Sequence, residues 1–375
     1  TNSPSLTFIL TYKFEFVGII MDRILLEESC EILDSRRIPI TASNRKEGPY
    51  PYYGANGIQD YVDDYIFDDE LVLLAEDGGN FGSKERPIAY RVSGKCWVNN
   101  HAHVLKPKDG INVDYLCYSL MFYDTEKLVN GATRQKLTQA MMRKMLIPKR
   151  SISEQKKIVA TLNTIRDSIV KQAKRIKLLD NLIKARFVEM FGDFDLAPQC
   201  NEWIKLSKLG EIVSGSTPKT GTAEYWDGDI CWITPAELNS MSGIVCDSKK
   251  KITEAGRNSC SLRLMPINTV ILSSRAPIGK VAILGKEMCC NQGFKNIICN
   301  EKILPKYLYY LLAYNTDYLN SLGRGATFRE ISKKIVEDIR ISLPSIEQQA
   351  KFITFSEQVD KSKFTLQNSI ISLMN

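Results

Sequence analysis

Apolar residues recur at alternating steps of four and three through residues 151–192, which is the spacing of a coiled-coil seam. The positions expected to pair with a second helix are Ile158, Leu162, Ile165, Ile169, Ile176, Leu179 and Ile183, with the polar Gln172 between them. A polar seam residue sets register at some cost in stability. The pattern predicts one helix of about 40 residues, about 60 Å long, with Ser153 as its N-cap.

A second seam runs through residues 346–375 and predicts a helix of about 28 residues, about 42 Å long. Its positions are Phe352, Ser356, Val359, Lys363, Leu366, Ile370 and Leu373. We expect Val359, Leu366, Ile370 and Leu373 to pair with the first helix in the antiparallel sense, so that the pair holds the remaining segments a fixed distance apart. A single core helix is the alternative.

The segments 21–150 and 193–345 mix short strands with helices. The β-rich runs are Ile88–Val92, Ile230–Ile233, Val281–Leu284 and Ile297–Cys299, bounded by Gly, Pro and Asn. Helical spacing follows at Val113–Val129, 138–145, Pro305–Leu322 and 329–337. The fold class is therefore α+β, with two similar globular domains separated by a pair of long antiparallel coiled-coil helices.

The similarity of the two segments rests on an internal repeat. Matching runs occur in the same order, at offsets of roughly 190 to 200 residues. The pairs are Leu71–Ala75 with Val270–Ser274, Asn100-His101 with Asn291-Gln292, Tyr115–Leu120 with Tyr307–Leu312, Gly131–Thr133 with Gly325–Thr327, Pro148 with Pro344, and Glu154–Lys156 with Glu347–Gln349. The order of the pairs makes chance agreement improbable.

Length and composition agree with a globular chain of two domains. At 375 residues, 44% hydrophobic and 25% charged, the chain exceeds the size of one hydrophobic core. The net charge of +7 is concentrated: residues 149–190 hold seven lysines and four arginines against four acidic residues. A basic helical segment of this kind is typical of a nucleic-acid partner.

The cysteines and the N-terminal segment indicate a cytoplasmic protein. The ten cysteines form no C-x-x-C pair, and His101 and His103 are the two histidines, so we expect reduced thiols and no metal site. Lys13 and Glu15 interrupt the apolar stretch in residues 1–20, which argues against a signal peptide or membrane span. We expect residues 1–20 to be an upstream or non-native extension; an extra edge strand is the alternative.

Catalytic motifs are missing or incomplete. The run Ser274–Val281 lacks the first glycine and the hydroxyl residue of a phosphate-binding loop, and Asp77–Gly82 is better interpreted as a turn than as a cofactor loop. Neither histidine lies in a nucleophile or triad context. We therefore expect no catalytic residue, no metal and no cofactor bound by this chain.

Basic, amide and hydroxyl side chains instead gather in the loops between strands. These groups match base edges and phosphates of DNA. In the first segment the candidates are Arg45, Lys46, Tyr52, Asn56, Asn80, Lys84, Arg86, Asn100, His101, Arg134 and Lys136. In the second they are Ser216, Thr217, Lys219, Thr234, Glu237, Asn239, Arg275, Lys280, Asn291, Gln292 and Arg324. For each single residue, a solvated loop or turn remains the alternative.

Four motifs together resemble a target-recognition domain of the specificity subunits of type I restriction-modification enzymes. They are Leu209–Pro218, Trp232–Pro235, Gly325–Thr327 and Leu343–Gln349. The resemblance covers nearly everything from Met21 onward. The first segment departs from it, with Asp34–Pro39 in place of the Gly-x-Thr-Pro loop and Tyr50–Gly57 in place of Trp-Ile-Thr-Pro.

The resemblance implies a non-catalytic subunit that binds a bipartite double-stranded DNA target. It also implies two modification subunits carrying S-adenosylmethionine, and restriction subunits using ATP and Mg. A specificity subunit of a related type II system is the alternative. A methyltransferase or nuclease, and a coiled-coil scaffold for proteins, are further alternatives from other classes.

Overall fold

The computed structural model describes residues 22–131, 134–192, 203–239, 241–260, 262–323 and 329–374. The chain divides into two compact units: unit 1 runs up to Ile176 and includes the residues from Phe364 onward, and unit 2 is Lys177–Lys363. Residues 1–20, and the extension expected there, lie outside the described part. Among the described helices, none is long and apolar enough to span a membrane.

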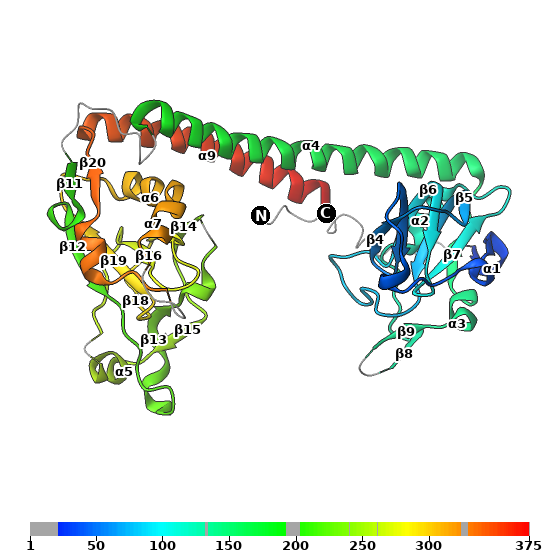
Figure 1. Ribbon diagram of the computed structural model, residues 1–375, viewed down its shortest axis with the longest axis horizontal. Coiled ribbons are helices and arrows are strands. Elements are labelled where there is room, and N and C mark those ends of the chain that lie inside the picture. The colour runs from blue at the N-terminus through cyan, green and yellow to red at the C-terminus, as the bar shows by residue number, and fades with distance from the viewer. Residues whose placement is uncertain are drawn as a thin grey trace. The chain divides into compact units, whose positions relative to one another are not determined.

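Unit 1 is built on a mixed sheet of six strands in the order β2-β7-β5-β6-β3-β4. Helix α2 packs on β5 and β6 (Figure 1), and smaller pairs join β1 to β10 and β8 to β9. The elements are β1 Arg23–Leu25, α1 Leu26–Ser29, β2 Cys30–Ile32, β3 Tyr50–Gly54, β4 Gly57–Val62, β5 Phe67–Ala75, β6 Ala89–Val98, β7 Ala102–Pro107, α2 Val113–Leu120, β8 Val129–Asn130, β9 Lys136–Leu137, α3 Gln139–Arg143 and β10 Leu146–Pro148.

Both faces of this sheet are covered. On one face Val72 and Leu74 of β5 join a buried cluster with Leu116 of α2. On the other, Leu71 and Leu73 pack in a second cluster. A strand that is buried on both sides carries a continuous apolar run rather than an alternating one, as Leu71–Ala75 does.

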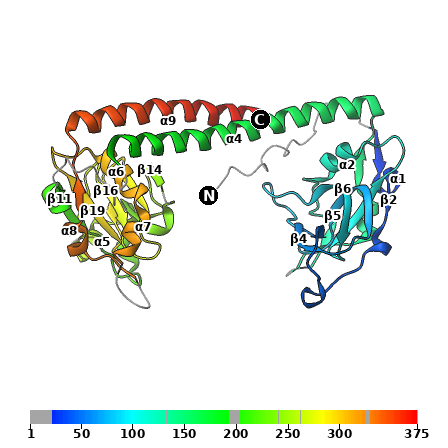
Figure 2. The same cartoon turned by 45° about the horizontal axis from the view of Figure 1, so that its top comes forward.

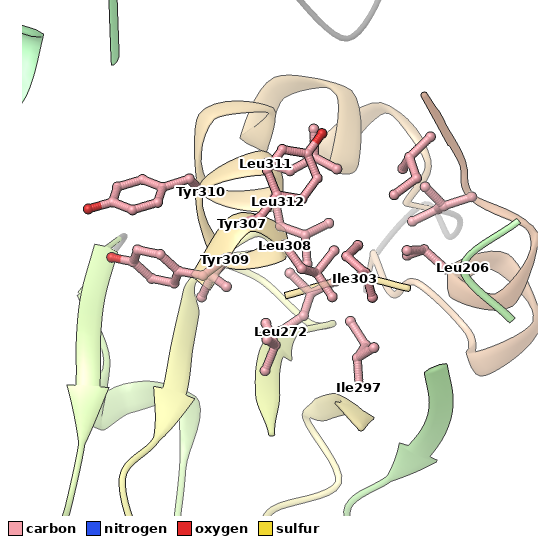
Figure 3. Close-up of a cluster of buried hydrophobic side chains, with 14 of the residues drawn as sticks. Leu206, Leu272, Ile297, Ile303, Tyr307, Leu308, Tyr309, Tyr310, Leu311 and Leu312 are labelled. Atoms are coloured by element: carbon pink, nitrogen blue, oxygen red, sulfur yellow. The ribbon is translucent and has the colours of Figure 1, made fainter. Parts of the chain in front are cut away.

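Unit 2 contains a five-stranded sheet, β12-β19-β16-β17-β14, a three-stranded sheet, β15-β13-β18, and the pair β11-β20. The elements are β11 Trp203–Lys205, β12 Gly210–Ser214, β13 Trp226–Ile233, β14 Met241–Val245, β15 Lys250–Ile252, α5 Glu254–Ser259, β16 Val270–Ser273, β17 Val281–Leu284, β18 Cys289–Cys290, β19 Phe294–Cys299, α6 Pro305–Tyr314, α7 Thr316–Ser321, α8 Lys333–Asp338 and β20 Arg340–Ser342. Figure 3 shows Leu308 of α6 turned toward Leu272 of β16 and Ile297 of β19, in the core of this unit.

The two units repeat one topology, as the sequence predicted. Strands β2-β7-β5-β6 of unit 1 are neighbours in the same order as β12-β19-β16-β17 of unit 2. The packing corrects the sequence alignment by one residue. Val72 lies in a cluster with Leu116 of α2 as Val270 lies in one with Leu308 of α6, whereas Leu71 is on the other face, so Val270 corresponds to Val72 and not to Leu71. A strand buried on both faces has no alternation that would reveal such a shift.

Three helices differ from their predicted lengths. The helix expected over Val113–Val129 ends at Leu120, and the chain beyond it turns, with the Glu126 N–H donating to Asp124 Oδ1 at 3.1 Å. The helix expected over Pro305–Leu322 is divided between α6 and α7 at Asn315, whose side chain donates to the Leu311 carbonyl at 2.7 Å. The helix expected at 329–337 begins only at Lys333, with Ser332 as its cap.

The long helices agree closely with their predicted bounds. Helix α4 spans Ile152–Phe191 and α9 spans Ile346–Met374. The predicted cap Ser153 is wrong: Ser151 accepts from the backbone N–H of Glu154 at 3.3 Å, and the Glu154 carboxylate accepts from the Ser151 N–H at 2.9 Å. This reciprocal capping box requires Glu or Gln three residues after the serine, which Ser151 has and Ser153 lacks.

The two helices pair in the antiparallel sense, and Figures 1 and 2 both draw α9 alongside the later part of α4. In unit 1, Gln172 donates to Ser369 at 3.2 Å. In unit 2, Lys363 lies 2.6 Å from Asp180, and the rings of Phe187 and Phe352 are 5.2 Å apart. From Gln172 to Asp180 to Phe187 along α4, the contacted residues of α9 have decreasing numbers, Ser369, Lys363 and Phe352, so the two helices run antiparallel.

The predicted seam is buried or half-buried along its length. Ile165, Ile169 and Ile176 form a cluster with Ile370 and Leu373 in unit 1. In unit 2, Leu179 and Ile183 join the main core, as does Val359. Leu366 is half-buried.

The first two predicted seam positions, Ile158 and Leu162, do not pair with α9 in the described part of the chain. They belong to no described cluster with α9, and the buried residues of this part of α4 are Gln155 and Val159. Here α4 packs on unit 1 itself, where the hydroxyl of Tyr118 donates to Asn163 at 2.6 Å. The last described residues of α9 already pack with Ile165 and Ile169, so the paired stretch begins there.

Candidate nucleic-acid interface

In unit 2, hydrogen bonds join four loops at the ends of β12, β13 and β16 and the start of β19. The Ser216 N–H donates to the Cys290 carbonyl at 2.9 Å, and the Asn291 N–H donates to the Ile233 carbonyl at 2.9 Å. The Ser274 N–H donates to the Gly293 carbonyl at 2.7 Å. Segments that lie up to 74 residues apart in sequence are thereby fixed against one another.

An amide and hydroxyl network lies at the centre of these loops. Asn291 donates from Nδ2 to Thr217 Oγ1 at 3.0 Å, Thr217 donates to Gln292, and the Gly293 N–H donates to Asn291 Oδ1 at 2.8 Å. A Cβ at Gly215 would lie 2.0 Å from the Asn291 carbonyl oxygen, so the close approach of the two loops requires glycine. The network holds three of the predicted residues, Thr217, Asn291 and Gln292, in one place.

Thr234, Glu237 and Lys280 have local structural partners. Thr234 and Glu237 form a capping box, and the second Glu237 oxygen accepts from the Lys249 N–H at 2.6 Å. Lys280 donates to the Pro235 carbonyl at 3.0 Å. These contacts shape the loop after β13 and hold it against the loop between β16 and β17.

Arg275 follows directly after the strand β16 and its turn residue Ser274. Its Nε donates to Glu330 Oε2 at 3.1 Å, and about half of its side chain is exposed. The other Glu330 oxygen lies 3.4 Å from the ammonium of Lys295, whose side chain is 6% exposed. Burial lowers the pKa of Lys295 below its ordinary value, although the neighbouring Glu330 acts to raise it.

Unit 1 assembles a comparable cluster at the ends of β5 and β7. Asp77 Oδ1 lies 2.6 Å from His101 Nδ1 and accepts from Arg134 Nη2 at 2.8 Å. Asn56 donates to the Gly78 carbonyl at 3.0 Å, which brings the β3–β4 turn to the same place. The structure thus brings together Asn56, His101 and Arg134 from three distant predicted positions.

A buried ion network lies against this cluster. His103 is fully buried between Asp34, 2.6 Å from its Nδ1, and the Leu137 carbonyl, 2.8 Å from its Nε2. Glu76 accepts from Arg37 at 2.6 Å and lies 3.1 Å from the ammonium of Lys136. The predicted Lys136 is therefore bound to Glu76 at the edge of the network.

Both carboxylates of the network are held in the ionised form. Burial acts to raise the pKa of Asp34, but the hydrogen bond and charge of His103, together with the Val104 N–H and Arg37, outweigh it, so the pKa lies below its usual value. Burial likewise opposes ionisation of Glu76, whose pKa is lowered by hydrogen bonds from Arg37 and Lys136. One potential ligand atom of each of Asp34, Glu76 and His103 lies within 4.8 Å of the others, and Arg37 contacts both carboxylates.

Arg45 and Tyr52 lie apart from the ion network. The guanidinium of Arg45 lies 4.3 Å from the centre of the Tyr52 ring and 3.2 Å from Asp60. Tyr52 is 1% exposed, and its hydroxyl contacts the backbone of Ile40. We therefore revise Tyr52 from a ligand contact to a support for Arg45.

The remaining candidates lie on the surface or outside the described part. Asn80 donates to the Pro87 carbonyl at 3.4 Å. Lys46, Lys84, Arg86, Asn100, Lys219 and Asn239 are exposed, and Ser216 is half-buried. Arg324 lies outside the described residues.

Sequence reasoning missed Asn99, Asp77, Lys295 and Glu330. Asn99 is the counterpart of Asn291. The side chain of each asparagine accepts a hydrogen bond at 2.8 Å from the backbone N–H two residues later. The backbone N–H of each donates to a carbonyl near the end of the corresponding strand, β3 for Asn99 and β13 for Asn291. The alignment that paired Asn100 with Asn291 was displaced by one residue. The sequence feature that could have aligned the two units correctly is the asparagine before a turn, Asn99 in unit 1 and Asn291 in unit 2.

Comparisons with known proteins give one family for both halves of the chain. The family model described as the type I restriction modification DNA specificity domain matches residues 23–179 and again 199–374. The MjaIX type I restriction enzyme specificity subunit of Methanocaldococcus jannaschii is 38% identical over 199 residues, which cover 51% of this chain and about half, 46%, of that protein.

A putative type I restriction enzyme specificity subunit of Haemophilus influenzae is 27% identical over 358 residues, covering 92% of this chain and 88% of that protein. Among solved structures, the type I restriction-modification S subunit from M. genitalium aligns over 96% of this chain and 95% of its own, with a TM-score of 0.57 at 15% identity. At that identity, the structural match shows a shared fold.

Proposed function

Because the chain belongs to the family of type I restriction-modification DNA specificity domains, with two copies of the domain, we propose that it recognises a bipartite double-stranded DNA target. One half-site would be recognised by each unit. The observation that carries this proposal is the convergence of the four loops in unit 2, with a comparable cluster in unit 1. Amide, hydroxyl and guanidinium groups fixed at one end of a sheet are the donors and acceptors that read base edges.

We further propose that this chain performs no chemistry itself. On this proposal, modification subunits carrying S-adenosylmethionine and restriction subunits using ATP and Mg assemble with it in the cytoplasm. The side chains of both clusters already hydrogen-bond to one another, as expected for residues that position a ligand. The relatives described above belong to type I systems, and nothing in them favours the type II alternative.

Footprinting of the complex with its modification subunits tests this function. We expect protection of two short DNA segments separated by an unspecified spacer, with affinity that falls steeply as salt rises, because lysines and arginines displace counterions from phosphates. Protection of a single continuous segment would contradict reading by two units. Binding that does not depend on salt or sequence would favour the scaffold alternative.

A further inference from the structure

The arginine after β16 in unit 2 is held in a way that ordinary surface arginines are not. Arg275 and Glu330 are joined by an isolated backbone bridge as well as by the 3.1 Å contact of their side chains. Exposed ion pairs usually contribute little and hold their side chains weakly. Here the backbone pairing fixes both attachment points, so the ion pair fixes the direction of the guanidinium.

The carboxylate of Glu330 also contacts the buried ammonium of Lys295. Lys295, in β19, is almost fully buried and reaches both Glu330 at 3.4 Å and the Ser274 hydroxyl at 3.3 Å. A buried ammonium needs a charged partner and accepting oxygens, and these two residues supply them. Glu330 is thus the shared anion between a buried lysine and an exposed arginine.

Within the part of the chain that the structure describes, this arrangement leaves the outer edge of the Arg275 guanidinium available. The hydrogen bond that the structure describes for Arg275 engages Nε. Nη1 and Nη2 carry the remaining donors of the planar guanidinium. Two parallel N–H donors are the complement of the O6 and N7 acceptors that guanine presents in the major groove.

Unit 1 also has an arginine paired with a carboxylate, Arg134 with Asp77, at the place that Arg275 and Glu330 occupy in unit 2. The acidic and the basic residue have exchanged positions. Asp77 corresponds to Arg275, because both follow the equivalent central strand and both form the isolated bridge, with Lys136 in unit 1 and with Glu330 in unit 2. In unit 1 the arginine is on the segment that contains Lys136: Arg134 donates to Asp77 at 2.8 Å, and its side chain is 61% exposed. Each unit therefore holds an exposed arginine against a carboxylate at this bridge: Arg275 is part of the bridge in unit 2, and Arg134 lies two residues before the bridge residue Lys136 in unit 1.

We propose that Arg275 is a specificity-determining residue that reads a guanine in the half-site of unit 2, with Glu330 and Lys295 as the residues that position it. The proposal rests on the proposed function and adds to it a base, a residue and a mechanism of positioning. It also explains why two units with one fold can read different half-sites: the charge at the equivalent position is negative in Asp77 and positive in Arg275.

The test uses the complex with its modification subunits and a pool of duplexes in which both half-sites are randomised. The wild-type complex is expected to select a guanine at one position that the Arg275→Ala complex no longer selects. Loss of a bidentate contact predicts an affinity for the original target about 5- to 150-fold lower. The half-site of unit 1 is expected to stay unchanged.

Arg263→Ala is the matched control. Arg263 is a similarly exposed arginine of unit 2 that pairs with Glu211, away from the four loops. It forms no described backbone bridge with its partner, in contrast to Arg275. We expect this variant to select the wild-type target with unchanged affinity.

Glu330→Gln tests positioning. The amide retains an acceptor but loses the charge that binds Arg275 and Lys295, so we expect the preference for that one guanine to weaken while the other positions keep theirs. A merely structural role would lower affinity at all positions equally, together with the melting temperature. Arg275→Lys, which keeps the charge on an exposed side chain, is expected to bind but to lose most of the preference for guanine.

Two results would overturn the inference while leaving the proposed function intact. One is an Arg275→Ala complex that selects the wild-type sequence at every position. The other is a uniform loss of affinity with a salt slope reduced by about one, which is the signature of a phosphate contact. Absence of any two-part selection by the wild-type complex would instead contradict the proposed function.

Discussion

Two buried glutamines, Gln155 and Gln349, show at the residue scale how the long helices are attached. Gln155 accepts from the Asn112 N–H at 2.8 Å and donates to the Gly110 carbonyl at 2.9 Å. Gln349 accepts from the Leu304 N–H at 2.8 Å and donates to the Lys302 carbonyl at 3.1 Å. Each therefore ties the first turn of its helix to the segment just before α2 or α6.

Replacing Gln349 with Ala is expected to lower the free energy of unfolding of unit 2 by about 2–3 kcal/mol, because it leaves buried backbone groups without partners. Thermal or denaturant unfolding measures the loss. Gln358→Ala, at an exposed position on the same helix, is the control and should change stability by less than about 0.5 kcal/mol. Equal losses in both variants would show that the tie contributes nothing specific.

The buried network of unit 1 predicts a dependence on pH. The pKa values of Asp34 and Glu76 are lowered in the folded state, so their contribution to stability is present above their unfolded values, about 3.9 and 4.3, and is lost as pH falls through the folded ones. We expect Asp34→Asn to destabilise unit 1 at pH 7, with a difference from wild type that shrinks toward acid.

Hydrogen exchange at Val104 is a direct measure, because its N–H donates to Asp34 Oδ1 at 2.9 Å. Exchange there should be faster in Asp34→Asn than in wild type at neutral pH, and the two should converge in acid. If the exchange rates of the two proteins differ by the same factor at every pH, the effect of Asp34→Asn comes from lost packing and not from lost charge. That result would contradict the ionised network.

At the scale of elements, the seam of α4 and α9 contains one residue that costs stability. Gln172 donates to Ser369, but its Oε1 is buried with no described hydrogen-bond partner. We expect Gln172→Leu to raise the stability of unit 1 by about 1–3 kcal/mol, because it removes the unpaired acceptor and adds apolar contact with Ile169 and Ile370.

The matched control for this variant is Gln367→Leu, which adds the same side chain at an exposed position of α9. Thermal unfolding of the two variants separates a seam effect from a general effect of leucine. Lower stability in Gln172→Leu would mean that the contact with Ser369 outweighs the unpaired oxygen.

The long helices could be predicted from the sequence nearly to the residue, because a heptad pattern repeats through many turns. Strand β17 was also predicted with its observed bounds, Val281–Leu284. The alignment of the two units was displaced by one residue, since strands buried on both faces carry no alternation. The helix break at Asn315 depends on one local side-chain bond, which apolar spacing does not reveal.

The candidate site was predicted only in part. Loop position and residue type identified Thr217, Asn291 and Arg275. Neither could identify Glu330, which reaches Arg275 only through the fold, or Lys295, whose burial is a tertiary property. Tyr52 was predicted as a DNA contact and is a core residue, 1% exposed.

For the whole molecule, the proposed function makes the helix pair the element that sets the spacer between half-sites. Removing residues 172–178 from α4 and 363–369 from α9 shortens both helices by one heptad and keeps the seam in phase. Seven residues correspond to about 10 Å of helix, so the preferred spacer should shorten by about three base pairs. The half-sites themselves are expected to remain.

A control for this deletion keeps the length and changes only the polar seam contact, as Gln172→Leu does. That variant should select the wild-type spacer. Selection of the wild-type spacer by the double deletion as well would contradict a measuring role for the helices.

The central claim is that each unit reads its own half-site, and sequencing of methylated adenines in cells that express this chain with its modification subunits tests it most directly. We predict a two-part motif with a fixed unspecified spacer, in which Arg134→Ala alters one half and Arg275→Ala alters the other. A single continuous motif, or a change in both halves caused by either variant, would contradict the account.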